Sequence, residues 1–139
     1  MRRKGKSSMR FTIDRLDHLV LHCTDLEQTA SWYQRVLGME RDEAGQHSQT
    51  ALKFGGQKII LQPFSPKDEP HAKHTQPGTA DLCLITAVGA DEIIEHLHQC
   101  GVTIVLGPVA RAGALGPLTS VYCRDPDGTL IEIGTYLAS

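Results

Sequence analysis

The chain has 139 residues, a formal net charge of −2 and only 5% aromatic side chains. This length fits one domain with a hydrophobic core of its own. The weak negative charge and the scarcity of aromatic rings argue against a nucleic-acid partner, which would need a basic surface or a stacking platform. No apolar run approaches the roughly 20 residues that cross a bilayer, so no membrane partner is expected.

The N-terminal stretch, residues 1–13, is basic and polar and predicts a disordered tail. Ser7 and Ser8 follow its charges, where a secretory leader would have an apolar stretch. The four cysteines form no C-x-x-C pair and lie in apolar runs, as reduced cysteines do: Cys23, Cys83, Cys100 and Cys123. These features predict a protein of a reducing compartment, the cytoplasm.

The first half of the chain predicts one strand, one helix and three further strands. Leu16–Cys23 is an apolar run typical of a strand. Asp25 can cap a following helix, whose apolar residues recur at helical spacing until Gly38 ends it. The remaining strands of this half are expected at residues 39–43, 49–54 and 58–64.

The second half repeats this order after a linker, residues 65–79, that contains three prolines and several charges. The glycine-rich residues 107–117 predict a loop, and Asp125-Pro-Asp-Gly128 has the composition of a turn. The strands are expected at residues 80–87, 103–106, 119–124 and 129–136, and the helix at residues 91–100.

This repeat predicts an α+β fold with paired β-α-β-β-β modules that form a cupped mixed sheet. The domain would span residues 14–139, with module one at 16–64 and module two at 80–136. Aligning the first strands of the two modules places His18 on Asp81, an offset of 81 − 18 = 63 residues. An ordinary α+β domain whose element order is coincidental is the alternative.

Three polar side chains interrupt apolar strands on the face that we expect to be the inner one. Alternate residues of a strand face opposite ways, so His18, Asp81 and Glu132 point away from the leucines and isoleucines that pack on the helices. We expect the three at matching heights on three strands. An imidazole and two carboxylates that converge are most readily stabilised by a divalent cation. The alternative is that each is an ordinary hydrogen-bonded or rim residue.

Three segments resemble the vicinal oxygen chelate superfamily, which includes glyoxalase I, extradiol dioxygenases, fosfomycin-resistance thiol transferases and bleomycin-binding proteins. They are LDHLVLHCTDLEQTASWYQRVLGME at 16–40, GPVARAGALGP at 107–117 and YCRDPDGTLIEI at 122–133. The chain is most similar to the glyoxalase-domain-containing proteins of this superfamily. The resemblance implies that the family's metal ligands fall on His18 and Glu132, and that Asp81 replaces the usual histidine.

Glyoxalases add a fourth ligand from the fourth strand, usually a glutamate. At that place the resemblance offers Ile60, which cannot bind a metal, or Gln62 after a two-residue slip, which could bind weakly. Because a strand-four carboxylate base is missing, we expect weak or absent conversion of the hemithioacetal of methylglyoxal and glutathione. The metal ion itself, Ni, Co, Mn, Zn or Fe(II), is left open.

Other residues are candidates for the pocket. Arg111 could clamp a substrate carboxylate or phosphate, although a solvated loop arginine is the plainer interpretation. Tyr122, with Ser120, shares the strand parity that lines the cup, and a core aromatic with its hydroxyl at the edge is the alternative. His22 shares the face of His18 and is assigned to the rim. The linker histidines His71 and His74 are spaced like a weak metal clip, although solvated loop histidines are the plainer interpretation.

These candidates predict a metal-dependent enzyme, and the resemblance implies that its chemistry is of the glyoxalase-like lyase or isomerase type. Its substrate would be a small carbonyl or carboxylate compound that chelates the metal, and its catalytic residues would be Glu132, Arg111 and Tyr122. The alternatives are an iron(II) dioxygenase and a non-catalytic protein that binds a small molecule, as bleomycin-binding relatives do. Modules of this superfamily pair within or between chains, so a homodimer is expected.

Overall fold

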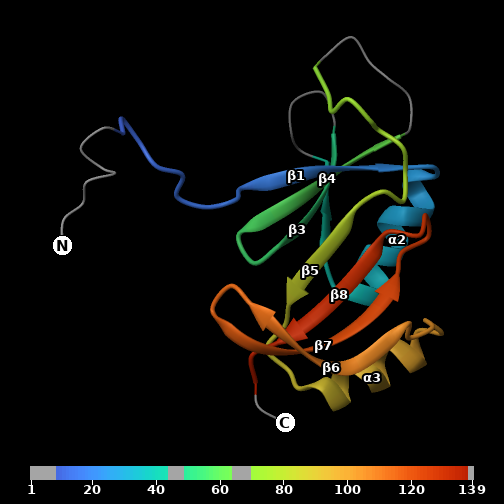
Figure 1. Cartoon of the computed structure of the whole chain (residues 1–139). Coiled ribbons are helices and arrows are strands. Elements are labelled where there is room, and N and C mark those ends of the chain that lie inside the picture. Colours follow the sequence, from blue (N-terminus) through green and yellow to red (C-terminus); the bar gives the residue numbers. More distant parts are fainter. Residues whose placement is uncertain (1–8, 44–48, 64–69, 138–139) are drawn as a thin grey trace.

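The computed structural model describes residues 9–43, 49–63 and 70–137, which form two modules of the same element order (Figure 1). Residues 1–8 of the expected tail and residues 65–69 of the expected linker lie outside the described residues. Residues 9–17 and 70–80 contain neither helix nor strand. Within the described part of the chain, no helix has the length and apolar character needed to cross a membrane.

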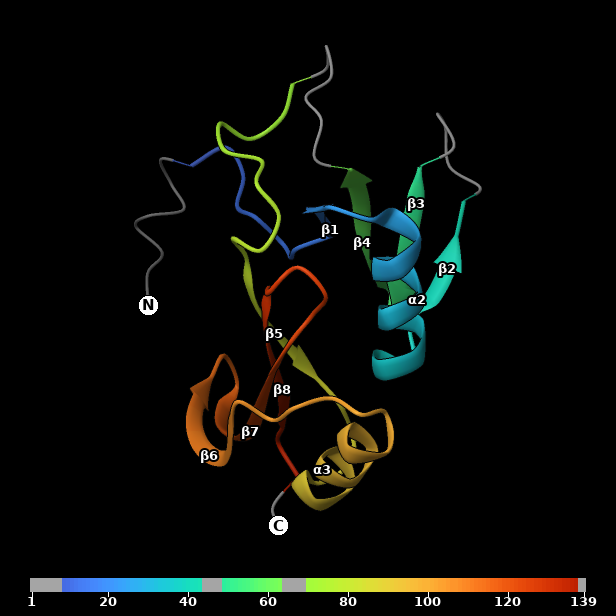
Figure 2. The same ribbon diagram turned by 90° about the vertical axis from the view of Figure 1, so that its right-hand side faces the viewer.

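Module one is a four-stranded mixed sheet with one helix packed on it (Figure 2). The strand order is β1-β4-β3-β2, in which β1 and β4 are parallel and the other neighbours are antiparallel. Its elements are β1 (His18–Cys23), α2 (Leu26–Leu37), β2 (Glu40–Asp42), β3 (Thr50–Phe54) and β4 (Gln57–Pro63).

Module two has the same topology, with strand order β5-β8-β7-β6 and β5 parallel to β8. Its elements are β5 (Asp81–Ile85), α3 (Ala90–Gln99), β6 (Leu106–Gly113), β7 (Gly116–Arg124) and β8 (Leu130–Thr135). The predicted repeat and α+β class are therefore confirmed, with two separate sheets in place of one continuous sheet.

Local signals fix the first helix. The Asp25 side chain accepts a hydrogen bond from the Gln28 backbone N–H, which satisfies one of the free donors of the first turn. At the other end Gly38 adopts a left-handed φ of 68° and ends the helix. Both caps agree with the sequence prediction.

The prediction of a loop at residues 107–117 is wrong, because most of these residues form the hairpin of β6 and β7. The strand expected at residues 103–106 starts only at Leu106, and β6 then continues to Gly113. A register irregularity between Leu106 and Val109 accommodates Pro108. β6 is the edge strand of its sheet, where a proline without an N–H is tolerated.

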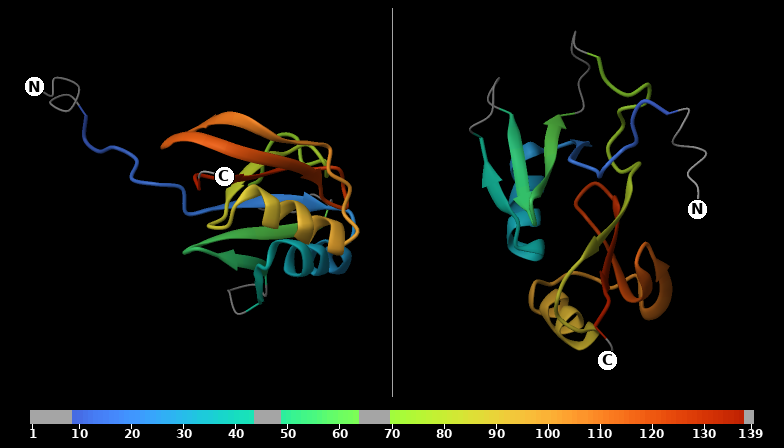
Figure 3. Two further views of the ribbon diagram at one scale, coloured as in Figure 1. Left: turned by 90° about the horizontal axis from the view of Figure 1, so that it is seen from below. Right: turned by 90° about the vertical axis from the view of Figure 1, so that its left-hand side faces the viewer.

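One apolar core joins the two modules. Leu21 and Ile59 of module one belong to the same buried cluster as Val121 and Ile131 of module two. In the ribbon views of Figure 1, Figure 2 and Figure 3, each helix lies against the sheet of its own module.

Polar contacts at the D-P-D-G turn also fasten the modules together. The Tyr33 hydroxyl of α2 donates to the buried Asp125 carboxylate at 2.8 Å. Asp125 also accepts the backbone N–H groups of Asp127 and Thr129, and the Asp127 carboxylate accepts the Thr24 N–H. These hydrogen bonds therefore satisfy polar groups of the turn itself and a backbone N–H just before module one's helix.

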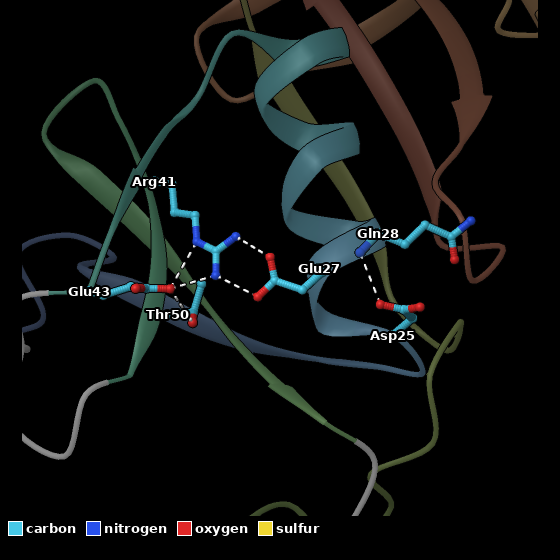
Figure 4. A network of polar contacts seen from close by, with 6 residues as sticks. All are labelled: Asp25, Glu27, Gln28, Arg41, Glu43 and Thr50. Carbon is cyan, nitrogen blue, oxygen red and sulfur yellow. Dashed lines mark hydrogen bonds and ion pairs between the residues drawn. The ribbon is translucent and has the colours of Figure 1, made fainter.

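A separate network ties the first turn of α2 to the edge of the sheet (Figure 4). Arg41 of β2 donates two hydrogen bonds to Glu27 at 2.8 Å and also binds Glu43, which accepts a bond from Thr50. The Arg41 hydrogen bonds hold the pKa of the exposed Glu27 carboxyl below its usual value. The network fixes the orientation of β2 against the helix.

Candidate functional site

Each sheet has one face covered by the shared core and a second face that we call the open face. On β1 the open face carries His18, Val20 and His22, because Leu19 and Leu21 pack into the core. On module two it carries Asp81, Cys83 and Glu132, because Leu82, Leu84, Ile131 and Ile133 pack inward. The predicted parity of the three candidate ligands thus agrees with the packing.

The register of the strands differs from the expected relative heights of these candidate ligands. Glu132 of β8 pairs with Cys83 of β5 on one side and with Tyr122 of β7 on the other. Asp81 pairs with Leu130, so it lies one pleat repeat away from Glu132. The expectation that Asp81 and Glu132 stand at matching heights is wrong, since parity alone determines the face of a side chain and not its register.

A serine that faces the same way holds the Glu132 carboxylate. The Ser120 hydroxyl of β7 is fully buried and donates to Glu132 Oε2 at 2.7 Å. A buried hydroxyl bound to a carboxylate orients that carboxylate and removes one of its rotational choices. Sequence parity places Ser120 on this face, but the bond itself depends on the diagonal neighbour that the register supplies.

Cys83 is a neighbour of Glu132 that sequence reasoning missed. Desolvation of the sulfur raises the pKa of the Cys83 thiol, and the nearby Glu132 carboxylate, followed by Asp81, raises it further. The thiol is therefore kept neutral, which removes it as a ready nucleophile.

Arg111 and Tyr122 form a pair on the same sheet. Arg111 Nε donates to the Tyr122 hydroxyl at 2.9 Å, and its guanidinium carbon lies 5.5 Å from the centre of the tyrosine ring. Arg111 Nη1 also donates to the Ala110 carbonyl at 3.0 Å. Arg111 lies on β6, and its partner Tyr122 lies on β7, the strand that pairs with the Glu132 strand β8.

His18 stands at the start of β1 with 42% of its side chain exposed. Its Nδ1 lies 2.8 Å from Asp17 Oδ1, and this hydrogen bond lowers the pKa of the Asp17 carboxyl. A carboxylate on Nδ1 assigns the proton to that nitrogen and leaves Nε2 as a free lone pair, which is the usual arrangement of a metal-binding histidine.

Among the described residues of the single chain, no three His, Cys, Asp or Glu side chains are grouped closely enough to hold a metal ion. The set His18, Asp81 and Glu132 therefore stays a prediction. The two residues considered for the fourth ligand lie at different positions along β4. Ile60 is buried beside Val20, whereas Gln62 pairs with His22 at the far end of β1 from His18.

Residues 15–133 match the model of the glyoxalase/bleomycin resistance protein/dioxygenase superfamily. The chain belongs to this superfamily. The resemblance noted from the sequence is thereby confirmed over nearly the whole domain.

Two curated relatives of this superfamily member cover most of its length. It is 44% identical over 134 residues to virulence protein STM3117 of Salmonella typhimurium, covering 96% of this chain and 92% of the relative. It is 41% identical over 131 residues to the glyoxalase domain-containing protein RDO1 of Mycosarcoma maydis, covering 94% and 73%.

Solved structures support the same fold. Integron cassette protein VCH_CASS1 of V. cholerae is 45% identical, with a TM-score of 0.88, and the match covers 93% of this chain and all of that one. More distant chains show the fold alone: a lactoylglutathione lyase from Agrobacterium tumefaciens (21% identical, TM-score 0.68, covering 89% and 95%) and the antibiotic-binding TnmS3 from Streptomyces (20%, 0.70, covering 91% and 98%). The glyoxalase-like fold thus occurs in both a lyase and a binding protein, and the site must decide between them.

Proposed function

We propose that this protein is a metal-dependent enzyme of the glyoxalase-like lyase or isomerase type, acting on a small substrate that chelates the metal through two oxygens. The observation that carries the proposal is the arrangement on the open face of module two. There Ser120 holds the Glu132 carboxylate, and Tyr122, which pairs with Glu132 across β7 and β8, holds the Arg111 guanidinium.

The donor chemistry fits a divalent cation. His18 has its Nδ1 committed to Asp17, and Glu132 keeps Oε1 while Ser120 binds Oε2. An imidazole nitrogen and carboxylate oxygens suit manganese, iron(II), nickel or zinc. When bound, such a metal supplies Lewis-acid stabilisation of negative charge on substrate oxygens.

Because the described residues of one chain include no such group of donors, we propose that two copies form the site. His18 would come from one protomer, and Asp81 and Glu132 from its partner. Large apolar side chains stay exposed at or near the open faces of the single chain, among them Val20 (43%), Ile85 (54%) and Leu106 (46%). A second copy would cover them, which accounts for both the exposed apolar surface and the divided ligand set.

The chain's own groups have distinct roles in this proposal. Glu132, which would also help to hold the cation, would take up and return the proton that moves between substrate carbons. Arg111 anchors a substrate carboxylate through its free nitrogen, and Tyr122 positions Arg111. β4 contributes no carboxylate to these groups, because its residue beside Val20 is the buried Ile60.

For that reason the proposed substrate is smaller than the glutathione hemithioacetal and brings its own carboxylate to Arg111. Turnover of the hemithioacetal should be about 10²–10⁴-fold below that of an enzyme with a positioned base. Thioester formation measured with metal-free protein supplemented by nickel, cobalt, manganese, zinc or iron(II) tests this point.

The experiment that tests the proposal is metal analysis of protein purified without chelator, for the wild type and for Glu132→Gln. We expect one divalent ion per site in the wild type and at least a tenfold weaker metal affinity in the variant. Glu95→Gln, on an exposed turn of α3, is the matched control. Wild-type protein that binds no divalent ion but retains a small molecule would show a binding protein instead.

A further inference from the structure

Residues 9–17, which we call the arm, leave the body of the molecule as a drawn-out segment before β1 (Figure 1; Figure 3, left). All of its large apolar side chains are exposed, and Phe11 (72%) and Ile13 (80%) are the most exposed of them. Met9, Phe11 and Ile13 alternate along the chain, which places them on one side of an extended segment. This pattern is typical of a strand, although the arm has no strand beside it among the described residues.

The backbone of the arm is almost without partners. Its one hydrogen bond with any described residue runs from Gln57 Nε2 to the Leu16 carbonyl oxygen at 3.1 Å. A segment that exposes both apolar side chains and free backbone N–H and C=O groups is one that proteins normally cover with another surface. The described part of its own chain does not supply that surface.

Module two carries a surface with the same two features. β5 is the end strand of its sheet, so its outer edge has no neighbouring strand among the described residues. Exposed apolar side chains follow at the C-terminal end of this edge, namely Ile85, Val88 and Leu137, which we call the terminal patch. A Cβ on Gly89 would lie 3.8 Å from Leu137 Cδ2, so the segments that carry Val88 and Leu137 are neighbours. A free edge beside apolar side chains is the surface that an added strand recognises.

The length of the arm and the place where it begins favour a second copy of this chain as its partner. Nine extended residues span up to about 30 Å, whereas the radius of gyration expected for a domain of this length is about 14 Å. The arm is therefore long enough to lie across another protomer. In the dimer of the proposed function, on which this step rests, His18 of one protomer lies beside Asp81 of its partner, so the arm begins at the first residue of the partner's β5.

Counting residues from that point matches the apolar groups of the two surfaces. Ile13 lies 18 − 13 = 5 residues before His18, and Ile85 lies 85 − 81 = 4 residues after Asp81. Traced back from His18 along the partner's β5, the arm runs antiparallel to that strand and brings Ile13 to Ile85. Phe11 then extends beyond the strand, over the rest of the terminal patch.

We propose that the arm of each protomer adds as an antiparallel strand to the free edge of the partner's β5 and covers the partner's terminal patch. The exchanged arms hold the two copies together and keep each His18 at the site that it shares.

The test is sedimentation equilibrium of the full-length chain carrying Ile13→Asp, a change at an exposed residue outside the hydrophobic core. We expect dimerisation to weaken at least about tenfold, because the new charge would be buried against the partner. Thr12→Asp places the same charge at the next position, on the opposite side of the arm, and should dimerise like the wild type.

A charge exchange tests the contact itself. Ile85→Lys should weaken dimerisation as Ile13→Asp does. The double variant Ile13→Asp, Ile85→Lys should recover a large part of the loss, because the new carboxylate of one protomer then meets the new ammonium group of its partner. Ile13→Asp that dimerises as tightly as the wild type, or a double variant no better than the two single ones, would overturn the proposal.

Two other occupants give different results, and either would overturn it. An arm that folds onto its own β5 would lower stability in Ile13→Asp at every protein concentration and leave dimerisation unchanged. Because basic residues precede the arm, a membrane surface is the other occupant: vesicles containing phosphatidylglycerol would then bind the wild type and not Ile13→Asp, again with unchanged dimerisation.

Metal analysis separates this proposal from the proposed enzyme. Wild-type protein that binds its metal while Ile13→Asp dimerises normally would remove the arm contact alone. Recovery of dimerisation in the double variant, in protein that binds no divalent ion, would confirm the arm contact and remove the metal site alone.

Discussion

At the scale of single residues, the orientation of the Glu132 carboxylate depends on the buried hydroxyl of Ser120. Ser120→Ala removes the 2.7 Å bond to Oε2 and leaves the carboxylate free to rotate. Removing a partner that orients a metal ligand typically costs about 10–100-fold in affinity, so we expect a loss near the lower end of that range. Titration with cobalt or manganese measures it.

Ser31→Ala is the control for this change, because Ser31 is exposed on α2. Unchanged metal affinity in Ser120→Ala, in protein that folds normally, would mean that the Ser120 bond has no part in the site.

Buried neutral groups also predict how stability depends on pH. Burial, followed by the Asp125 carboxylate, raises the pKa of Tyr33, and burial raises the pKa values of the Cys23 and Cys123 thiols from 9.0 to about 11. These groups lose protons more readily in the unfolded chain. For the two thiols the stabilising contribution is therefore complete below pH 9.0 and is lost as the pH rises to about 11, whereas that of Tyr33 is complete below pH 10.0 and falls above it.

Urea unfolding at about pH 8, 9, 10 and 11 should show a free energy of unfolding that falls across this window. The double variant Cys23→Ala, Cys123→Ala should have a shallower decline, although it starts from a lower stability. A constant free energy of unfolding up to about pH 11 would show that these groups are not shielded from solvent.

At the scale of elements, the sequence predicted most helices and strands because their signals are local. The Asp25 cap, the Gly38 end and the alternation in β1 and β8 each depend on a few neighbouring residues. The hairpin of β6 was missed because its glycines and Pro108 suit a loop, and only the edge position in the sheet makes them acceptable in a strand.

The site was predicted less completely for a related reason. Alternation showed which face His18, Asp81 and Glu132 share, but the register of β5 on β8 brings Cys83 to Glu132 in place of Asp81. Ser120 and the Arg111–Tyr122 pair likewise depend on which residues of neighbouring strands stand diagonally opposite. Such pairings are non-local and have no signal within one strand.

The segment that precedes β5 packs on the D-P-D-G turn, and this contact leads to a prediction at the scale of elements. Gly78 and Gly56 have almost the same positive φ, 79° and 78°. A Cβ at Gly56 meets no described atom within 4 Å, whereas one at Gly78 meets backbone. Gly56→Ala should cost about 1 kcal/mol for the left-handed conformation, and Gly78→Ala at least about 2 kcal/mol.

Chemical denaturation of the two variants under identical conditions measures the difference. Equal losses of stability in the two variants would show that the segment is not seated on the turn in solution.

At the scale of the whole molecule, the open faces and the divided ligand set lead to one expectation, a homodimer with shared sites. Sedimentation should show a species of twice the 15.2 kDa chain at micromolar concentration. A species of single-chain mass throughout that range would exclude the shared site.

Subunit mixing gives the sharper test of sharing. His18→Ala and Glu132→Ala should each abolish most metal binding alone, because every site of such a dimer lacks one donor. In a dimer mixed from the two variants, the His18 of one protomer meets the Glu132 of the other, so one of the two sites has all its donors. Random mixing makes about half of the dimers mixed, and metal content should return to about one quarter of the wild-type value. Sites built within one chain would always lack a donor, and mixing would restore nothing.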